Sequence, residues 1–163
     1  MSRHLPIMLL TALLCLGTAA QAATIEISGV KLEDSTDVRG SRLQLNGAGI
    51  RYKAVFKVYV AGLYLSKKAA SLEEVVGGPG PKRMSVTMVR DIDAAELGKL
   101  LTRGMEDNTG RADMSKLVPG LIRMSQIFSD QKKLVSGDNF MIDWVPGVGS
   151  VITVKGKVQG EPF

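Results

Sequence analysis

A glycine-studded turn followed by a long strand-like run constrains the fold of this chain more than any other stretch. Residues 45–65 read LNGAGIRYKAVFKVYVAGLYL, and neither glycine nor proline occurs from Arg51 to Ala61. A single strand over residues 51–65 would span about 50 Å at about 3.3 Å per residue, too long for a small domain. We therefore predict a tight turn near residues 52–54 and a hairpin, with Arg51 on one arm and Tyr59 on the other.

Other segments show the alternation of apolar and polar residues that is typical of half-buried strands. They are residues 24–32, with a bulge or turn at Gly29, residues 42–45, residues 82–91, and a final hairpin over residues 140–158. Residues 33–41 are polar and predict a connecting loop.

Three helices are predicted from capping signals and apolar spacing. Ser71 and Glu74 have the spacing of a capping box before a short helix. Asp93 can cap a second helix that ends near residue 108. A third helix runs from Asp113 to about residue 131, and Pro119 should kink or divide it. Its core-facing side is predicted to carry Met114, Leu117, Val118, Leu121, Ser125 and Phe128. This order of elements predicts an α+β domain with a mostly antiparallel sheet covered by helices on one face.

The first 22 residues have the pattern of a secretory signal. Arg3 gives the positive start, residues 5–16 the apolar core, and Ala20-Gln21-Ala22 a small-x-small cleavage site. The apolar run is about a dozen residues, whereas a membrane-spanning helix needs about 20. We expect residues 1–22 to be a signal peptide and residues 23–163 to form one domain, periplasmic or secreted, with no stable membrane anchor after cleavage. An uncleaved anchor is the alternative.

Cleavage would also remove the chain's one histidine and one cysteine, His4 and Cys15. The remaining 141 residues would then lack the side chains of Cys-His and Ser-His-Asp catalysis and the usual ligands of zinc or copper. We expect neither a metal nor another cofactor. The net charge of +5 is spread along the chain without blocks of like charge, and aromatic residues are sparse, so nucleic-acid binding is not expected.

Two other kinds of signal have ordinary explanations. The glycine motifs at residues 46–49 and 146–149 precede predicted strands rather than helices, so they indicate turns or bulges and not a phosphate loop. The acidic residues Asp91, Asp93, Glu96, Glu106 and Asp107 fit the solvated face of a helix better than a catalytic carboxylate pair.

Arg51 is the strongest candidate for a functional side chain. Its guanidinium is always charged and offers a planar fork that suits a carboxylate or an enolate-like oxygen. If it points inward, it needs an anionic partner, because an unpaired buried charge is costly. An outward-facing strand arginine is equally consistent with the spacing.

Several of these stretches resemble the chalcone isomerase-like proteins, and more specifically their small exported bacterial branch. They are residues 45–51 and 56–65, Arg90-Asp91-Ile92, Gly137-Asp138, and residues 144–149 leading into 154–157. The resemblance implies an open-faced β-sandwich, in which a large antiparallel sheet is packed by helices and a ligand cleft lies between them. It also implies an arginine in that cleft, which helps to bind a phenolate in the plant isomerases and pairs with the carboxylate in relatives that bind fatty acids.

Only the arginine of the family's site carries over securely, as Arg51. The strand threonine of the enzymes falls at Tyr59, and their helix tyrosine and asparagine fall at Leu97 and Gly104. The family's C-terminal ligand-contacting helix has no counterpart before Phe163, so the chain is expected to be either a short member or a fragment.

Three functions follow from this comparison. The first is a binding protein for a small acidic apolar molecule such as a fatty acid, with Arg51 on the carboxylate and Tyr59 or Tyr64 donating a hydrogen bond. The second is a domain for structure or interaction with an unused cleft, and the third is a chalcone-type isomerase, an intramolecular lyase. We rank them in that order.

Overall fold

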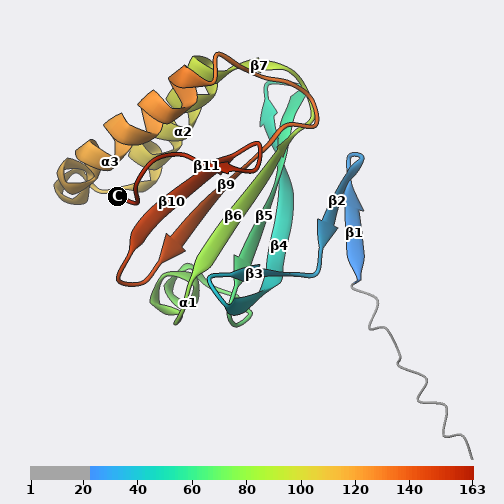
Figure 1. The fold of residues 1–163 in the computed structure, drawn as a ribbon, viewed down its shortest axis with the longest axis vertical. Coiled ribbons are helices and arrows are strands. Elements are labelled where there is room, and N and C mark those ends of the chain that lie inside the picture. The colour runs from blue at the N-terminus through green and yellow to red at the C-terminus, as the bar shows by residue number, and fades with distance from the viewer. Residues whose placement is uncertain (1–22) are drawn as a thin grey trace, which may run out of the picture.

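The main body of the protein is a curled antiparallel sheet of seven strands. A computed structural model describes residues 23–163, so the predicted signal peptide lies outside the described residues. The strands lie in the order β11-β10-β9-β6-β5-β4-β3 (Figure 1). In chain order they are β3 (Ser35–Val38), β4 (Ser41–Lys53), β5 (Phe56–Leu65), β6 (Lys82–Met88), β9 (Asn139–Val145), β10 (Gly149–Val154) and β11 (Lys157–Val158).

Two long helices cover one face of this sheet, which we call the helix face (Figure 1). They are α2 (Ala94–Asn108) and α3 (Arg111–Asp130), and they pack against each other. Gly98 lies at this contact, where an added Cβ would be in ordinary van der Waals contact with Cβ of Phe128, at 3.6 Å. The short α1 (Leu72–Gly77) lies at one end of the sheet. No helix among residues 23–163 is long and apolar enough to span a membrane.

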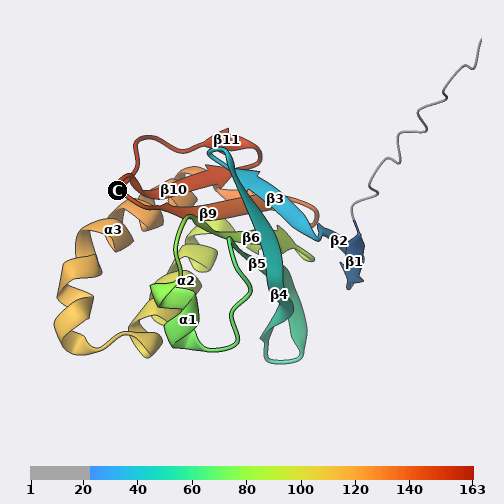
Figure 2. The same cartoon turned by 90° about the horizontal axis from the view of Figure 1, so that it is seen from below.

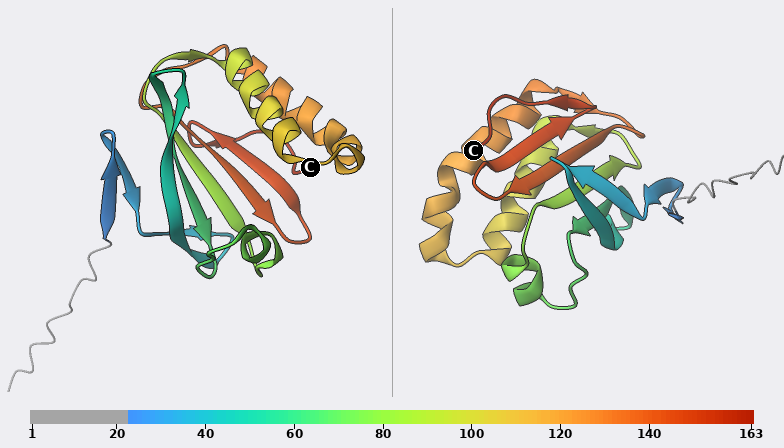
Figure 3. Two further views of the ribbon diagram at one scale, coloured as in Figure 1. Left: turned by 180° about the vertical axis from the view of Figure 1, so that it is seen from behind. Right: turned by 60° about the horizontal axis from the view of Figure 1, so that its bottom comes forward.

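Two small two-stranded sheets complete the fold. Strands β1 (Thr24–Ile27) and β2 (Val30–Glu33) pair with each other beside the opposite face of the main sheet, which we call the hairpin face. Strands β7 (Ile92–Asp93) and β8 (Lys133–Leu134) connect the start of α2 to the end of α3. Figure 3 shows the β1–β2 hairpin standing apart from the helices, across the sheet.

The predicted hairpin over residues 51–65 is confirmed, with its turn at Ala54 and Val55. The strand pairing shifts register twice, once after Leu45 and once after Arg51. Asn46 is the extra residue of the first bulge, and its side-chain oxygen accepts a hydrogen bond from the backbone N–H of Ala69 at 2.8 Å. A bulge of this kind changes which face the following side chains occupy.

Each face of the sheet has its own apolar core. On the helix face the core joins α2, α3 and the central strands, and Phe128 of α3 meets Phe140 of β9 edge to face at 4.9 Å. On the hairpin face a second core includes Leu32, Leu43, Val60 and Tyr64. Burial in these two cores supplies the main stabilisation of the fold.

An ion pair joins the central strands on the hairpin face. Nε and Nη2 of Arg83 donate to the two carboxylate oxygens of Asp143, each at 2.7 Å, and Nη1 donates to the Thr36 hydroxyl at 3.0 Å. The two charged side chains are 16% and 8% exposed. Because Thr36 belongs to β3, this network holds the first strand of the curled sheet against β6 and β9.

The last residues of the chain cover the outer edge of β10. Beyond β11, the N–H of Gln159 donates to the carbonyl of Ile152 at 2.8 Å. Phe163 and Ser150 exchange two backbone hydrogen bonds, of 2.7 and 3.1 Å.

The predicted α+β fold, with a large antiparallel sheet packed by helices, is confirmed. The caps are confirmed too, since Ser71 accepts from Glu74 N–H and Asp93 from Glu96 N–H. The predicted loop over residues 33–41 was wrong, because β3 lies there and pairs with β4. Its polar residues alternate in the sheet, and only Val38 reaches the core.

α3 runs through Pro119 to Asp130, so the helix is not divided there, and the kink that was the other expectation stays a prediction. The predicted core-facing side of the helix was wrong at two positions. Leu117 and Val118 are exposed rather than packed, because the core-facing side of the helix passes through Leu121, Met124 and Phe128 instead.

We predict that the Arg83–Asp143 pair is a main determinant of stability. Asp143→Ala should lower the free energy of unfolding by about 3 kcal/mol, because it leaves the guanidinium largely buried and unpaired. Arg83→Met/Asp143→Leu should recover most of that loss. Asp37→Ala removes the exposed pair with Arg42 and should change stability by less than about 0.5 kcal/mol. Urea unfolding of the wild type and the three variants measures these differences, and equal effects of the two single aspartate substitutions would contradict the prediction.

Candidate functional site

The structure brings Arg51 and Tyr59 together on the helix face. They are direct partners in the β4–β5 ladder, and directly opposed residues share a face. Tyr59 packs against the helix-face core and is partly buried, whereas Arg51 is exposed. The bulge at Asn46 produces this placement, since regular alternation from Leu45 would point Arg51 to the hairpin face.

The guanidinium of Arg51 has no fixed partner. In the described part of the chain, no hydrogen bond or ion pair joins it to another residue. The charge of Arg51 acts on the nearby phenol of Tyr59. Burial raises the pKa of Tyr59 above its ordinary value, and the positive charge of Arg51 offsets part of this increase. A cation without an acid beside a partly desolvated hydroxyl group is suited to bind an anionic oxygen.

On the helix face, β4 carries glycines instead of side chains next to Arg51. Gly47 and Gly49 pair with Leu63 and Ala61, so they share the helix face with Arg51. Neither glycine has a positive φ, and a Cβ added to either would meet no atom within 4 Å. Nothing in the chain itself therefore requires glycine here, and open space lies above this part of β4.

Apolar side chains that are only partly buried border the helix-face core. They come from β5, β6, β9, α2 and α3 and all pack against the helix-face core: Tyr59, Ala61, Met84, Ile142, Leu100, Leu101, Met105 and Met114. Side chains of this kind can contact an apolar chain, and the methionines can adapt to different shapes.

A hollow of about 420 Å³ lies between the hairpin end and the start of α2. Its apolar lining comes from Ala54, Phe56, Val58 and Ile92, and charged side chains surround it. An ion pair between Lys53 and Glu96 connects the hairpin to α2 across this hollow.

Tyr64 is not brought to the same place. It is buried in the hairpin-face core, and its hydroxyl donates to the carbonyl of Glu33 at 3.1 Å. Burial, followed by the charge of Glu33, raises its pKa. The geometry thus groups Arg51 with Tyr59 and separates both from Tyr64, whose role in ligand binding stays a prediction.

The positions expected to match the isomerases' helix residues offer no polar side chain. Leu97 is fully buried in the helix-face core, and Gly104 lies in α2 with open space around it. The described residues contain no cluster of three or more acidic, histidine or cysteine side chains that would hold a metal ion.

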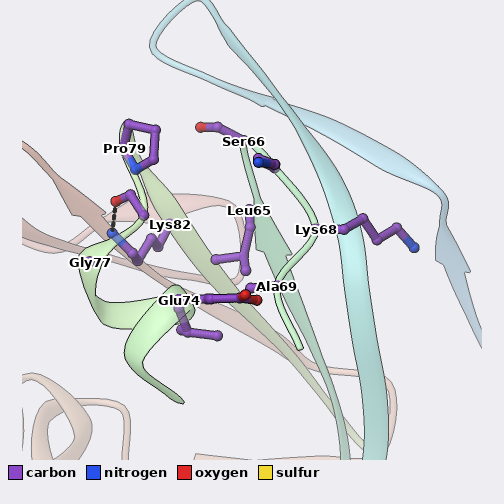
Figure 4. A pocket seen from close by; sticks show the side chains of 11 residues that line it. Leu65, Ser66, Lys68, Ala69, Glu74, Gly77, Pro79 and Lys82 are labelled. Carbon is purple, nitrogen blue, oxygen red and sulfur yellow. Dashed lines mark hydrogen bonds between the residues drawn. The ribbon is translucent and has the colours of Figure 1, made fainter. Parts of the chain in front are cut away.

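Sequence reasoning missed two further features. One is the polar network around Arg83 and Asp143, which borders a hollow of about 250 Å³ on the hairpin face. The other is a hollow of about 270 Å³ beside α1, shown in Figure 4. There Lys82 donates to the Gly78 carbonyl at 2.9 Å and lies over the Trp144 ring at 4.3 Å, so its charge is already engaged. The sequence does carry a signal for the polar network: Arg83 and Asp143 are opposite charges within segments whose apolar and polar residues alternate as in strands.

We predict that the charge of Arg51 holds down the pKa of Tyr59. In a Tyr52→Phe/Tyr64→Phe background only Tyr59 titrates, and its phenolate absorbance can be followed with pH. Arg51→Ala should raise the pKa of Tyr59, because the phenolate loses the nearby positive charge. Lys53→Ala removes a cation two residues away and should leave the pKa unchanged. An unchanged pKa in the Arg51 variant would show that the two groups do not interact.

Comparisons with known proteins agree with this architecture. Residues 23–162 match the family described as chalcone isomerase-like. Among solved structures, the chain is similar to a fatty-acid binding protein of Arabidopsis thaliana, with a TM-score of 0.65 and 15% sequence identity. The similarity covers 86% of this chain and 81% of that protein, and at this identity it shows the fold alone. The comparison with curated proteins found no match.

Proposed function

The chain belongs to the chalcone isomerase-like family, and from this premise we propose that it is an exported, bacterial-type member that binds a small acidic apolar molecule such as a fatty acid. The observation that carries the proposal is the guanidinium of Arg51, which has no acidic partner and lies opposite Tyr59 on the helix face. The carboxylate of the ligand would pair with Arg51 and accept a hydrogen bond from the Tyr59 hydroxyl.

The surroundings of Arg51 support an apolar tail on the same ligand. The space above Gly47 and Gly49 is open, and the partly exposed apolar side chains of β5, β6, α2 and α3 border the helix-face core beyond it. A carboxylate at Arg51 would leave the chain of a fatty acid free to lie along this surface, where burial of apolar area favours binding.

Two observations favour binding over turnover. Leu97 and Gly104 supply neither a proton donor nor an acceptor where the isomerases are expected to carry tyrosine and asparagine. The structurally similar Arabidopsis protein is described as a fatty-acid binding protein, which is consistent with a carboxylate ligand on this fold.

Native mass spectrometry of the protein, expressed with its full sequence and recovered after export, tests the proposal. We expect an acidic lipid to co-purify, and the measured mass to lack residues 1–22. Arg51→Ala should weaken the affinity for a long-chain fatty acid at least about tenfold, and Tyr59→Phe somewhat less, because hydrogen bonds to charged groups contribute about 1.5–3 kcal/mol.

Arg103→Ala is the matched control, because it removes a highly exposed arginine of α2 and should leave the affinity unchanged. Tyr64→Phe tests the predicted role of Tyr64: a loss of affinity would support that role, and normal affinity would leave Tyr59 as the hydrogen-bond donor. If Arg51→Ala binds the fatty acid as tightly as the wild type, the proposed role of Arg51 is wrong. Turnover of a hydroxychalcone above the spontaneous rate, lost in Arg51→Ala, would favour the isomerase instead.

Filling the open space should separate binding from stability. Gly49→Val adds a β-branched side chain above β4 where no atom of the protein would meet its Cβ. We expect the free energy of unfolding to rise by about 0.5 kcal/mol, since glycine weakens a strand. The affinity for the fatty acid should fall about tenfold, because the side chain occupies the ligand's space. Isothermal titration and urea unfolding measure the two effects, and an unchanged affinity would place the ligand elsewhere.

A further inference from the structure

The end of the β4–β5 hairpin exposes apolar side chains that neither core uses. Tyr52, Val55 and Phe56 are 48%, 82% and 59% exposed, and none belongs to either apolar cluster. Figure 2 shows this end of the hairpin extending beyond the rest of the sheet. A protruding group of exposed apolar residues is typical of a surface that contacts another apolar phase.

The same hairpin end is positively charged. Residues 51–57 contain three cations, Arg51, Lys53 and Lys57, and no acid. Arg90 adds a fourth cation, because its guanidinium lies over the Phe56 ring at 5.0 Å. Lys57 donates to the Ser28 hydroxyl at 3.0 Å, which leaves its charge uncompensated.

The acids near this end are each engaged. Asp91 pairs with Lys133 at 2.7 Å, Asp93 caps α2, and Glu96 pairs with Lys53. They lie at the start of α2, beside the hairpin rather than on its turn. Among the described residues, Arg51, Lys57 and Arg90 are then the cations of the hairpin end that have no ion-pair partner. The turn therefore presents apolar side chains with an excess of positive charge.

From this combination we propose that the hairpin end, residues 51–57, docks onto the surface of an anionic phospholipid bilayer. Phe56 and Val55 would enter the boundary between headgroups and acyl chains, with Tyr52 at headgroup depth. Lys57 and Arg90 would lie among the lipid phosphates, where each basic residue near an anionic surface contributes about a fivefold gain in binding.

Another exposed apolar pair shows why the charge matters. Leu72 and Val76 on α1 are 72% and 69% exposed, but Glu73 and Glu74 lie between them in the sequence. Acids beside an apolar pair oppose an anionic bilayer, so α1 offers a comparable apolar area with the wrong charge.

Docking through this hairpin would place Arg51 and Tyr59, which lie on the same two strands, beside the bilayer. A fatty acid partitions into that environment. The docking itself rests on the exposed side chains of the turn and does not require that the protein binds a fatty acid.

Vesicle sedimentation tests the docking with the exported protein. Vesicles of phosphatidylglycerol and phosphatidylcholine should bind the wild type, vesicles of phosphatidylcholine alone should bind it weakly, and added salt should release it. Val55→Ser/Phe56→Ser should lower the partition coefficient at least tenfold. Lys57→Gln should lower it about fivefold on the anionic vesicles alone.

Leu72→Ser/Val76→Ser is the matched control, and it should bind as the wild type does. All variants carry the same N-terminus, verified by mass, so vesicle binding by residues 1–22 affects them equally. The proposal would be overturned if the wild type and Val55→Ser/Phe56→Ser bound the vesicles equally, or if the wild type did not bind them. A protein partner would then be the alternative occupant of this surface. Fatty-acid affinity is measured separately, and Val55→Ser/Phe56→Ser should keep it, so that failure of docking and failure of ligand binding are distinguishable.

Discussion

The extra residue at Asn46 decides which side chains of β4 reach which core. Before the bulge, Leu43 and Leu45 point to the hairpin face; after it, Ala48 and Ile50 do so. Without the inserted residue, Arg51 and the two glycines would occupy that face instead. The hydrogen bond from Ala69 N–H to the Asn46 side chain fixes the bulge to the segment after β5. The face on which Arg51 lies thus depends on the hydrogen-bonded bulge at Asn46, earlier in the same strand.

The two faces of the sheet have different chemistry as a result. On the hairpin face the charges of Arg83 and Asp143 satisfy each other, and buried side-chain polar atoms without a partner are absent from the described residues. On the helix face the cation at Arg51 is left without an acid, next to residues that have no side chain. A polar network whose groups are all paired within the protein stabilises the fold, whereas a charged group without a partner in the protein is available to bind a ligand.

Much of the architecture could be predicted from the sequence, because local signals and tertiary structure agree. The capping residues Ser71 and Asp93, the turn inside residues 51–65 and the final hairpin all depend on neighbours in sequence. The loop expected over residues 33–41 failed because pairing with β4 outweighed its polar composition. The exposure of Leu117 and Val118 depends on where α3 meets the sheet. The pairing of Arg51 with Tyr59 rather than Tyr64 follows from strand register, and alternation alone does not locate a bulge.

The tail of the chain has a consequence for how copies of the protein meet. Phe163, Gln159 and β11 occupy the backbone groups along the outer side of β10. A long free edge would let β10 of one molecule add to the sheet of another, which is how native sheets begin to polymerise. At the opposite edge, β3 is only four residues long and contains a charged Asp37. The β10 edge is therefore closed to strand addition by a second copy, whereas β4 beyond Leu45 has no strand partner on its outer side among the described residues.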